Sequence, residues 1–152
     1  MEIRADDLTA PAVLNLLRLH LAGMQDESPP ESVHALGAEA LRGADVSFWC
    51  AWDGEKLLGF GALKALDAGH GEIKSMRTAP GALRRGVGAA MLAHIVAEAR
   101  ARGYRRLSLE TGSTPAFDAA IALYARFGFA PCGAFADYRD DDPFSRFMTR
   151  AL

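Results

Sequence analysis

One stretch, residues 84–102, constrains the fold and function of this chain more than any other. It opens with Arg-Arg-Gly-Val-Gly at positions 84–88 and continues at once with apolar residues at helical spacing. Glycine lets backbone N–H groups turn toward a ligand with no Cβ in the way. The first four N–H groups of a helix have no internal partner, and the helix dipole favours negative charge there. Because two arginines adjoin the glycines, the pattern favours a phosphate or pyrophosphate site over a plain glycine turn.

Two common nucleotide-binding motifs do not fit this loop. A P-loop needs Gly-Lys-Ser/Thr after its glycines, and that sequence is absent. A dinucleotide fingerprint needs a third small residue where Met91 stands, and a continuously apolar strand leading straight into the glycines. The preceding segment, residues 72–77, instead carries alternating charges, and residues 78–85 intervene. The loop therefore belongs to neither class.

Length and composition bound the class of protein. The chain has 152 residues, 50% of them hydrophobic, which predicts one globular domain over residues 1–152 with a full core. A net charge of −2 gives no case for a nucleic-acid partner, and no run of about 18 apolar residues exists to span a membrane. The acidic N-terminus does not resemble a signal peptide, and Cys50 and Cys132 lack CxxC spacing. We therefore expect buried free thiols in a cytoplasmic protein.

Periodicity and turn residues predict the order of elements. Helices are predicted from a cap at Asp7 or Thr9 to Met24, from a capping box at Ser28 to Gly43, from Val87 to Gly103, and from Thr114 to Gly128. Strands are predicted near Ile3 and over residues 46–52, 57–66, 72–77, 106–110, 129–135 and 144–149. The strands over 72–77 and 106–110 are joined through a helix, so they should lie parallel. The fold class is α/β, a mixed and mostly antiparallel sheet of about six or seven strands with about four helices.

The chain resembles the GNAT N-acyltransferase superfamily across nearly its whole length. The pyrophosphate loop of that family reads Arg/Gln-x-x-Gly-x-Gly/Ala; Gly86 and Gly88 match its glycines, and Leu83 departs from its first position. Residues 122–129, Ala-Leu-Tyr-Ala-Arg-Phe-Gly-Phe, resemble the Leu-Tyr-x-x-x-Gly-Phe segment of the family. The sequences of residues 74–78 and 108–113 are similar to those of a small bacterial subgroup, the YsnE-like proteins. The resemblance implies a single GNAT-like domain that uses acetyl-CoA (coenzyme A) as co-substrate.

The resemblance also implies where the co-substrate lies. Backbone groups of the strand before the loop hold the pantetheine arm, and the same backbone supplies an N–H near the thioester oxygen. Either Arg84 or Arg85 supplies the side-chain contact to the pyrophosphate, because Leu83 cannot. The implied cofactor-binding set is Met76, Arg77, Thr78, Arg84, Arg85, Gly86, Val87, Gly88, Ala89, Phe117 and Tyr124. No metal is expected, since the four histidines lack metal-ligand spacing.

Tyr124 is the predicted general acid. It occupies the position of the family tyrosine that faces the CoA sulfur. A phenol with a pKa of about 10 can protonate a thiolate whose conjugate acid has a pKa of about 8.5 with modest help from the site. The alternative is an aromatic side chain that fills the core beside Phe117 and Ile121.

Glu72 is the predicted general base, because some family members carry a catalytic glutamate on this strand. Simple alternation along the strand predicts that Glu72, Lys74 and Met76 share one face. An ordinary carboxylate and an ammonium differ in pKa by about 6 units, so burial must raise the carboxyl pKa or water must mediate the transfer. An ion pair with Lys74 is the alternative role, and Glu110 is the rival base. An anionic group on the acceptor could be recognised by Lys74, Arg77, Tyr138 or Arg139.

Two classes of function remain open from the sequence. The first is an N-acetyltransferase that moves an acetyl group from acetyl-CoA to a primary amine, on a small molecule or a peptide, by direct attack in a ternary complex. The second is a non-catalytic acyl-CoA sensor or interaction module on the same fold, and the retained Tyr124 favours the enzyme. Relatives that pair through their last strands make a homodimer compatible with the sequence.

Overall fold

The computed structural model describes residues 1–152, built around a seven-stranded mixed sheet. Only the central pair, β4 and β5, is parallel, and every other neighbouring pair is antiparallel, which confirms the predicted fold class. In sheet order the strands are β1 (Glu2–Ala5), β2 (Val46–Asp53), β3 (Lys56–Asp67), β4 (His70–Thr78), β5 (Arg106–Gly112), β7 (Ser145–Ala151) and β6 (Ala130–Cys132).

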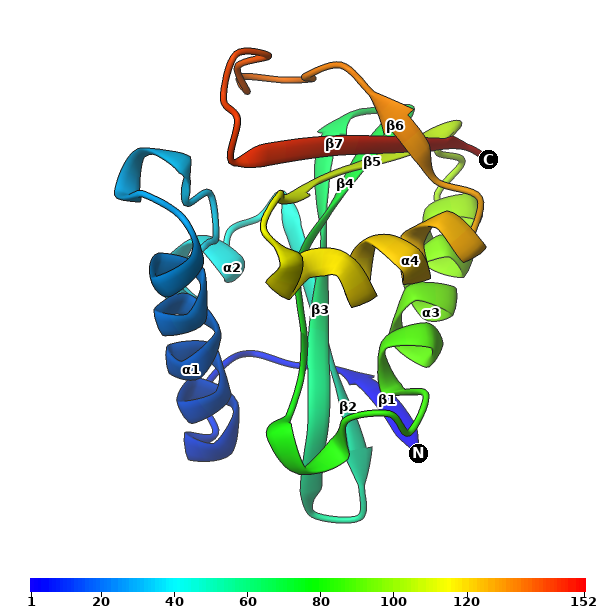
Figure 1. Ribbon diagram of the computed structural model, residues 1–152. Helices are drawn as coiled ribbons and strands as arrows, with labels where there is room; N and C mark the ends of the chain where they lie inside the picture. The colour runs from blue at the N-terminus through cyan, green and yellow to red at the C-terminus, as the bar shows by residue number, and fades with distance from the viewer.

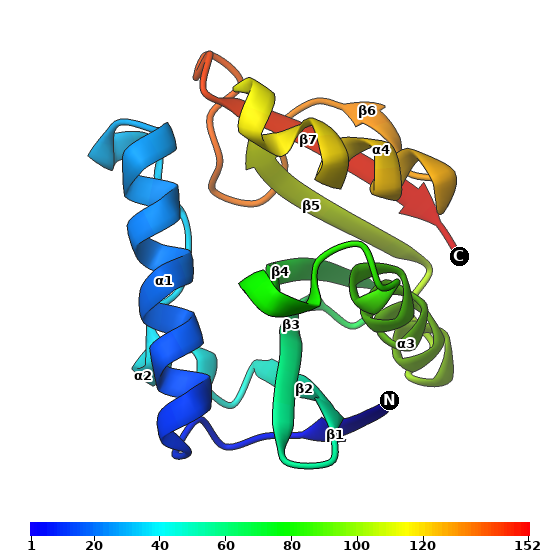
Figure 2. The same ribbon diagram turned by 60° about the horizontal axis from the view of Figure 1, so that its bottom comes forward.

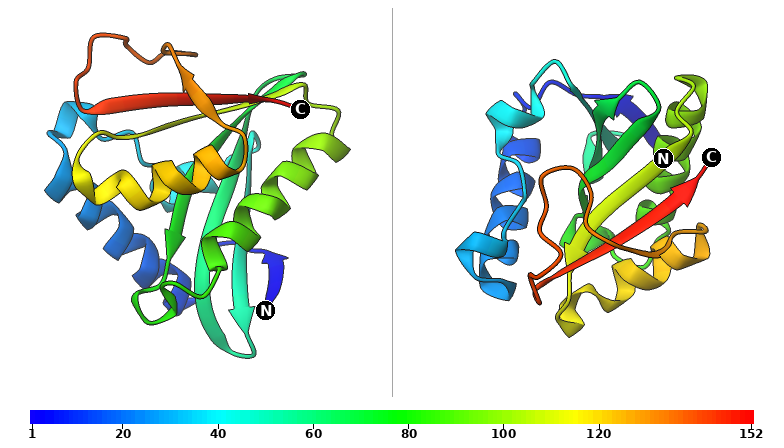
Figure 3. Two further views of the ribbon diagram at one scale, coloured as in Figure 1. Left: turned by 45° about the vertical axis from the view of Figure 1, so that its right-hand side comes forward. Right: turned by 90° about the horizontal axis from the view of Figure 1, so that it is seen from above.

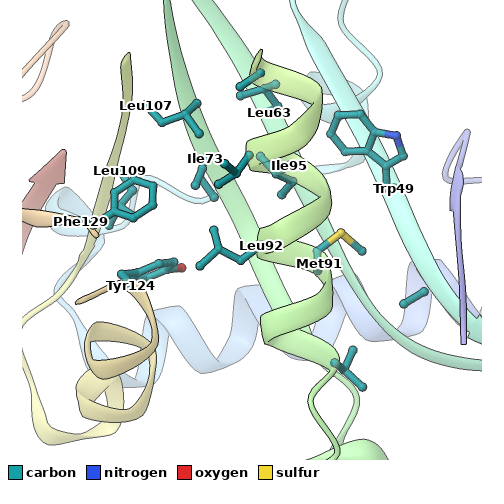
Figure 4. Close-up of a cluster of buried hydrophobic side chains, with 14 of the residues drawn as sticks. Trp49, Leu63, Ile73, Met91, Leu92, Ile95, Leu107, Leu109, Tyr124 and Phe129 are labelled. Atoms are coloured by element: carbon teal, nitrogen blue, oxygen red, sulfur yellow. The ribbon is translucent and has the colours of Figure 1, made fainter. Parts of the chain in front are cut away.

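Helices cover both faces of this sheet (Figures 1 and 2). They are α1 (Pro11–Glu27) and α2 (Ala38–Leu41) on one face, and α3 (Val87–Ala101) and α4 (Asp118–Arg126) on the other. The core on the α3 side includes Leu92, Ile95 and Leu107, all without exposed surface (Figure 4). A smaller core packs α1 against the opposite face around Phe60. None of the helices has the length and apolar character that crossing a membrane requires.

The parallel pair forks. Pairing between β4 and β5 runs from His70 opposite Arg106 to Ile73 opposite Leu109 and then stops. Both strands continue, β4 to Thr78 and β5 to Gly112. The backbone of residues 74–78 therefore has no partner strand on the side that faces β5, and its polar groups are free for a ligand.

A bulge in β4 lies at the fork. Phe60 of β3 pairs with Arg77 and Ala62 pairs with Lys74, so β4 carries one extra residue there, and Ser75 has φ 53°. The extra residue reverses the alternation of side chains. Met76 consequently packs against the core on the α3 side. Simple alternation, which put Met76 on the same face as Glu72 and Lys74, is wrong for Met76.

The second predicted helix needs correction. Residues 30–43 form a 3-10 turn at Pro30–Ser32, an irregular segment at 33–37 and the four-residue α2. Ser28 makes no capping bond, because Pro29 is extended with ψ 153°, as a residue before a proline prefers. Residues 33–35 of this segment line a pocket rather than a helix face.

The first helix and the last strands differ from expectation in smaller ways. Asp7 and Thr9 do not cap α1; their side chains bond to each other at 2.6 Å, and Pro11 starts the helix. Strand β6 is three residues long where residues 129–135 were predicted. The 133–144 loop that follows folds back over the sheet (orange in Figure 3), and Ala136 in it has φ 50°.

Candidate active site

The glycine loop presents a run of backbone N–H donors that the chain itself does not use. Gly86 adopts φ 78° and caps α3, and the first helical bond runs from the N–H of Ala90 to the carbonyl of Gly86 at 3.0 Å. The N–H groups of residues 84–89 have no acceptor in the protein. Arg85 lies 4.0 Å from Asp53, whereas Arg84 forms no ion pair. Unpaired N–H groups at a helix start, beside two guanidinium groups, make an anion cradle.

The cradle adjoins the end of β4. A Cβ placed on Gly88 would stand 3.2 Å from Leu123 and 3.9 Å from the hydroxyl of Thr78. The N-terminus of α3, the end of β4 and α4 therefore meet at Gly88. A ligand whose phosphates sit on the loop would reach the fork along the free backbone of residues 74–78.

A pocket lies at the fork itself. It is bounded by α1, residues 28–35, the diverging ends of β4 and β5, and α4. Of the predicted site residues, it gathers Glu72, Lys74, Met76, Glu110, Phe117 and Tyr124.

Glu72 and Lys74 form a buried pair on its wall. Their charged atoms are 3.3 Å apart, and their side chains are 3% and 9% exposed. The hydroxyl of Tyr138, on the 133–144 loop, donates to the Glu72 carboxylate and accepts from Lys74 at 2.8 Å. Burial and the nearby carboxylates raise the pKa of Tyr138, which keeps it a donor. The ring of His34 packs edge-on against Tyr138 at 5.0 Å.

The carboxylate of Glu110 has different partners from that of Glu72. Burial raises its pKa to about 7, against a smaller opposing effect from its one hydrogen bond, which Ser145 donates at 2.7 Å. No cation forms an ion pair with it, although Lys74 lies across the fork. Two carboxylates in one pocket thus differ in environment, one paired and one poised to exchange a proton near neutral pH.

Tyr124 reaches the pocket from the opposite face. It is 7% exposed and belongs to the core on the α3 side, where it packs on Phe129 (Figure 4). Its hydroxyl makes no hydrogen bond within the chain, and the side chain lines the pocket. Burial, with a smaller effect of Glu110, raises the pKa of Tyr124 to about 12, so the phenol stays protonated.

Three predicted acceptor contacts, Arg77, Tyr138 and Arg139, do not line this pocket, although Tyr138 bonds to Glu72 and Lys74 on its wall. Arg77 extends toward α1, where its guanidinium would lie 3.4 Å from a Cβ on Gly23. Arg139 is largely exposed and pairs with Asp141 at 2.7 Å. No three His, Cys, Asp or Glu side chains converge in a way that could hold a metal ion.

Sequence patterns missed several polar residues of the pocket, among them His20, His34 and Ser75. His20 is 3% exposed on α1, where leucines dominate, and its Nδ1 has no partner. The hydroxyl of Ser75 is likewise buried without a partner, at the bulge. No local pattern marks either residue, because each reaches the pocket through tertiary packing.

An anion cradle beside a forked parallel pair fits the acyl-CoA site that the resemblance to N-acyltransferases implies. Residues 13–129 match the acetyltransferase (GNAT) family, and the chain belongs to this family. It is 56% identical over 152 residues, 100% of both chains, to the uncharacterized N-acetyltransferase YsnE of Bacillus subtilis. Both the predicted family and the YsnE-like subgroup are thereby confirmed.

Solved structures show the same fold. A Klebsiella pneumoniae crystal structure assigned as an acyl-CoA N-acyltransferase is 30% identical, with a TM-score of 0.78 over 99% of this chain and 97% of that one. A GNAT family acetyltransferase from Elizabethkingia anophelis, solved with acetyl-CoA bound, is 18% identical, with a TM-score of 0.71 over 99% and 97% of the two chains.

Proposed function

We propose that residues 1–152 form a single domain that transfers the acetyl group of acetyl-CoA to a primary amine by direct attack in a ternary complex. The observation that carries the proposal is the fork, with Glu110 on one face of the sheet and Tyr124 on the other. A thioester lying in the fork would be attacked from the Glu110 face, while its sulfur leaves toward Tyr124. Base and acid then serve opposite sides of one carbonyl carbon.

Glu110 is the base in this proposal, rather than Glu72. Lys74 and Tyr138 both donate to the same oxygen of the Glu72 carboxylate, so that oxygen is already engaged and is not available to an incoming amine. Glu110, whose pKa burial raises to about 7, takes the proton of the attacking amine directly or through one water. The amine nitrogen bonds to the carbonyl carbon, and the carbon–sulfur bond breaks.

Tyr124 then gives its proton to the departing thiolate, which becomes the free thiol of CoA. The burial that raises the pKa of Tyr124 to about 12 would also raise that of a thiol in the same place, so the transfer stays near balance. The free N–H groups of β4 at the fork are the donors for the thioester oxygen. A donor of this kind is worth about 3 kcal/mol in acyl transfer.

The glycine loop would hold the CoA pyrophosphate, with the pantetheine along residues 74–78. Replacing Gly88 with Val places branched carbons between Leu123 and the Thr78 hydroxyl, in the path of that arm. We expect the dissociation constant of CoA, measured by calorimetry, to rise about tenfold or more, the equivalent of one lost charge-assisted hydrogen bond. Ala97→Val, on the exposed face of the same helix, is the matched control; equal affinities in the two variants would contradict the placement.

The direct test is release of free CoA thiol from acetyl-CoA across a panel of primary amines and peptides. An enzyme should release thiol only when an acceptor amine is present, at a rate that saturates with both substrates. Tight CoA binding without release for any amine would instead support a sensor. The free thiols of Cys50, buried, and Cys132, half-buried, fit the cytoplasmic location that we propose for this activity.

A further inference from the structure

We infer that the acceptor carries a carboxylate next to its reactive amine, as an α-amino acid does, and that Lys74 binds this carboxylate. The inference rests on the proposed function and adds the chemical class of the acceptor. What carries it is the position of two opposite charges at the mouth of the fork.

Lys74 and Glu110 face each other across the fork. Ile73 and Leu109 are the last paired residues of β4 and β5, so Lys74 and Glu110 are the next residue on each strand. Ile73 and Leu109 belong to the core on the α3 side, which places Lys74 and Glu110 together on the opposite face, in one pocket. Neighbouring strands lie about 4.8 Å apart, and the two side chains form no ion pair with each other.

An α-amino acid spans such a gap naturally. Its amine and its carboxylate are separated by a single carbon, so the amine can meet the base on β5 while the carboxylate meets the ammonium on β4. A simple amine would fill only the Glu110 half. A carboxylate several carbons away would miss Lys74 while the amine stays at the thioester.

Lys74 is the one cationic side chain on the pocket wall. Of the other cations that could have served, Arg77 lies against α1 and Arg139 is paired with Asp141. His20 is neutral near pH 7, because burial, with the charge of Arg77, lowers its pKa to about 4. Burial and the charge of Lys74 lower the pKa of His34 as well. An anionic group in this pocket therefore has a single charged partner.

Lys74 also has hydrogen-bonding capacity left for a ligand. An ammonium carries three donors, and Lys74 uses two of them, one on Glu72 at 3.3 Å and one on Tyr138 at 2.8 Å. The third is unassigned within the chain. A buried ion pair contributes little stability over apolar side chains of the same volume, so the pair on a pocket wall is better explained by a ligand than by folding.

The test compares acceptors that differ only in the carboxylate. Thiol release from acetyl-CoA is measured with a mixture of the proteinogenic L-amino acids and with a matched mixture of the corresponding amines that lack the carboxylate. For the best matched pair, such as L-phenylalanine and 2-phenylethylamine, kcat/KM of the amino acid should exceed that of the amine by about 10- to 100-fold, the worth of a charged hydrogen bond.

Two variants locate the source of the preference. In Lys74→Met, the ratio of the two kcat/KM values should fall by about 10- to 100-fold from its wild-type value. Comparing this ratio between the variant and the wild type cancels the difference in basicity between the two substrates. Because this change leaves Glu72 buried without its partner, the double variant Glu72→Gln with Lys74→Met, in which no charge is orphaned, should show the same collapse. Thermal melts establish that each variant is folded.

The outcomes separate the two proposals. Thiol release with equal rates for amino acids and amines, or with faster rates for amines, would overturn the acceptor class and leave acetyl transfer standing. A preference for amino acids that survives in both variants would overturn the role of Lys74. Release with neither mixture would overturn the acceptor class, and acetyl transfer itself would be overturned as well if the peptides of the wider panel also gave no release.

Discussion

Replacing Tyr124 with Phe is expected to lower kcat for acetyl transfer by about 100-fold or more, the usual worth of a positioned general acid. The variant loses only the hydroxyl, which makes no hydrogen bond within the chain, and keeps the ring that packs on Phe129. The fold and the dissociation constant of CoA should therefore remain as in the wild type. Steady-state thiol release and calorimetric titration with CoA measure the two quantities on the same protein.

The matched control is Tyr104→Phe, which removes a hydroxyl from a half-buried tyrosine packed beside Gly71, outside the pocket. Its kcat should stay within about twofold of the wild type, as expected of a change away from the reacting groups. A Tyr124 variant with wild-type turnover would refute the acid role and leave water to protonate the thiolate. A variant that instead lost CoA affinity would show that the phenol binds the co-substrate.

The anion-binding role of the loop at 84–88 could be predicted from the sequence because it depends on neighbouring residues alone. Gly86 adopts a left-handed backbone conformation that favours glycine, and the N-terminus of a helix favours an anion. All the residues concerned are consecutive in the chain. The parallel pairing of β4 with β5 could likewise be predicted from the sequence, since neighbouring strands that are joined through a helix lie parallel. In both cases the physical requirement lies within one stretch of chain.

The site beyond the loop depends on contacts between distant segments. Tyr138 meets Glu72 because the 133–144 loop, in which Ala136 has φ 50°, folds back over the sheet. Simple alternation also misplaced Met76, because a bulge in β4 depends on its register with β3. The two glutamates therefore looked alike in sequence, although one is paired with Lys74 and the other is desolvated beside Ser145.

Glu110→Gln is expected to lower kcat/KM by about 100- to 10,000-fold, since an amide cannot accept the proton of the amine. In the wild type, kcat/KM should rise with pH up to about 7, the pKa to which burial raises Glu110, because only the carboxylate is a base. The variant should lose that inflection and keep only the slope set by deprotonation of the amine. Glu98→Gln, on the surface of α3 beside Arg102, is the control. An unchanged inflection near pH 7 in Glu110→Gln would assign it to another group.

The same substitution should make the protein more stable, in a way that depends on pH. The pKa of Glu110 is raised from 4.5 in the unfolded chain to about 7 in the fold, so between these values the fold holds a proton that the unfolded chain has released. Stability is therefore lost as pH rises through this window. Glu110→Gln removes the loss, so its unfolding free energy should exceed that of the wild type by up to about 3 kcal/mol above pH 7, with no difference below about pH 4. Denaturant titrations at pH 4 and pH 8 measure this difference in unfolding free energy. A variant less stable than the wild type at pH 8 would mean that the carboxylate contributes to stability. A more stable variant would identify Glu110 as a charge that is kept buried for its chemistry.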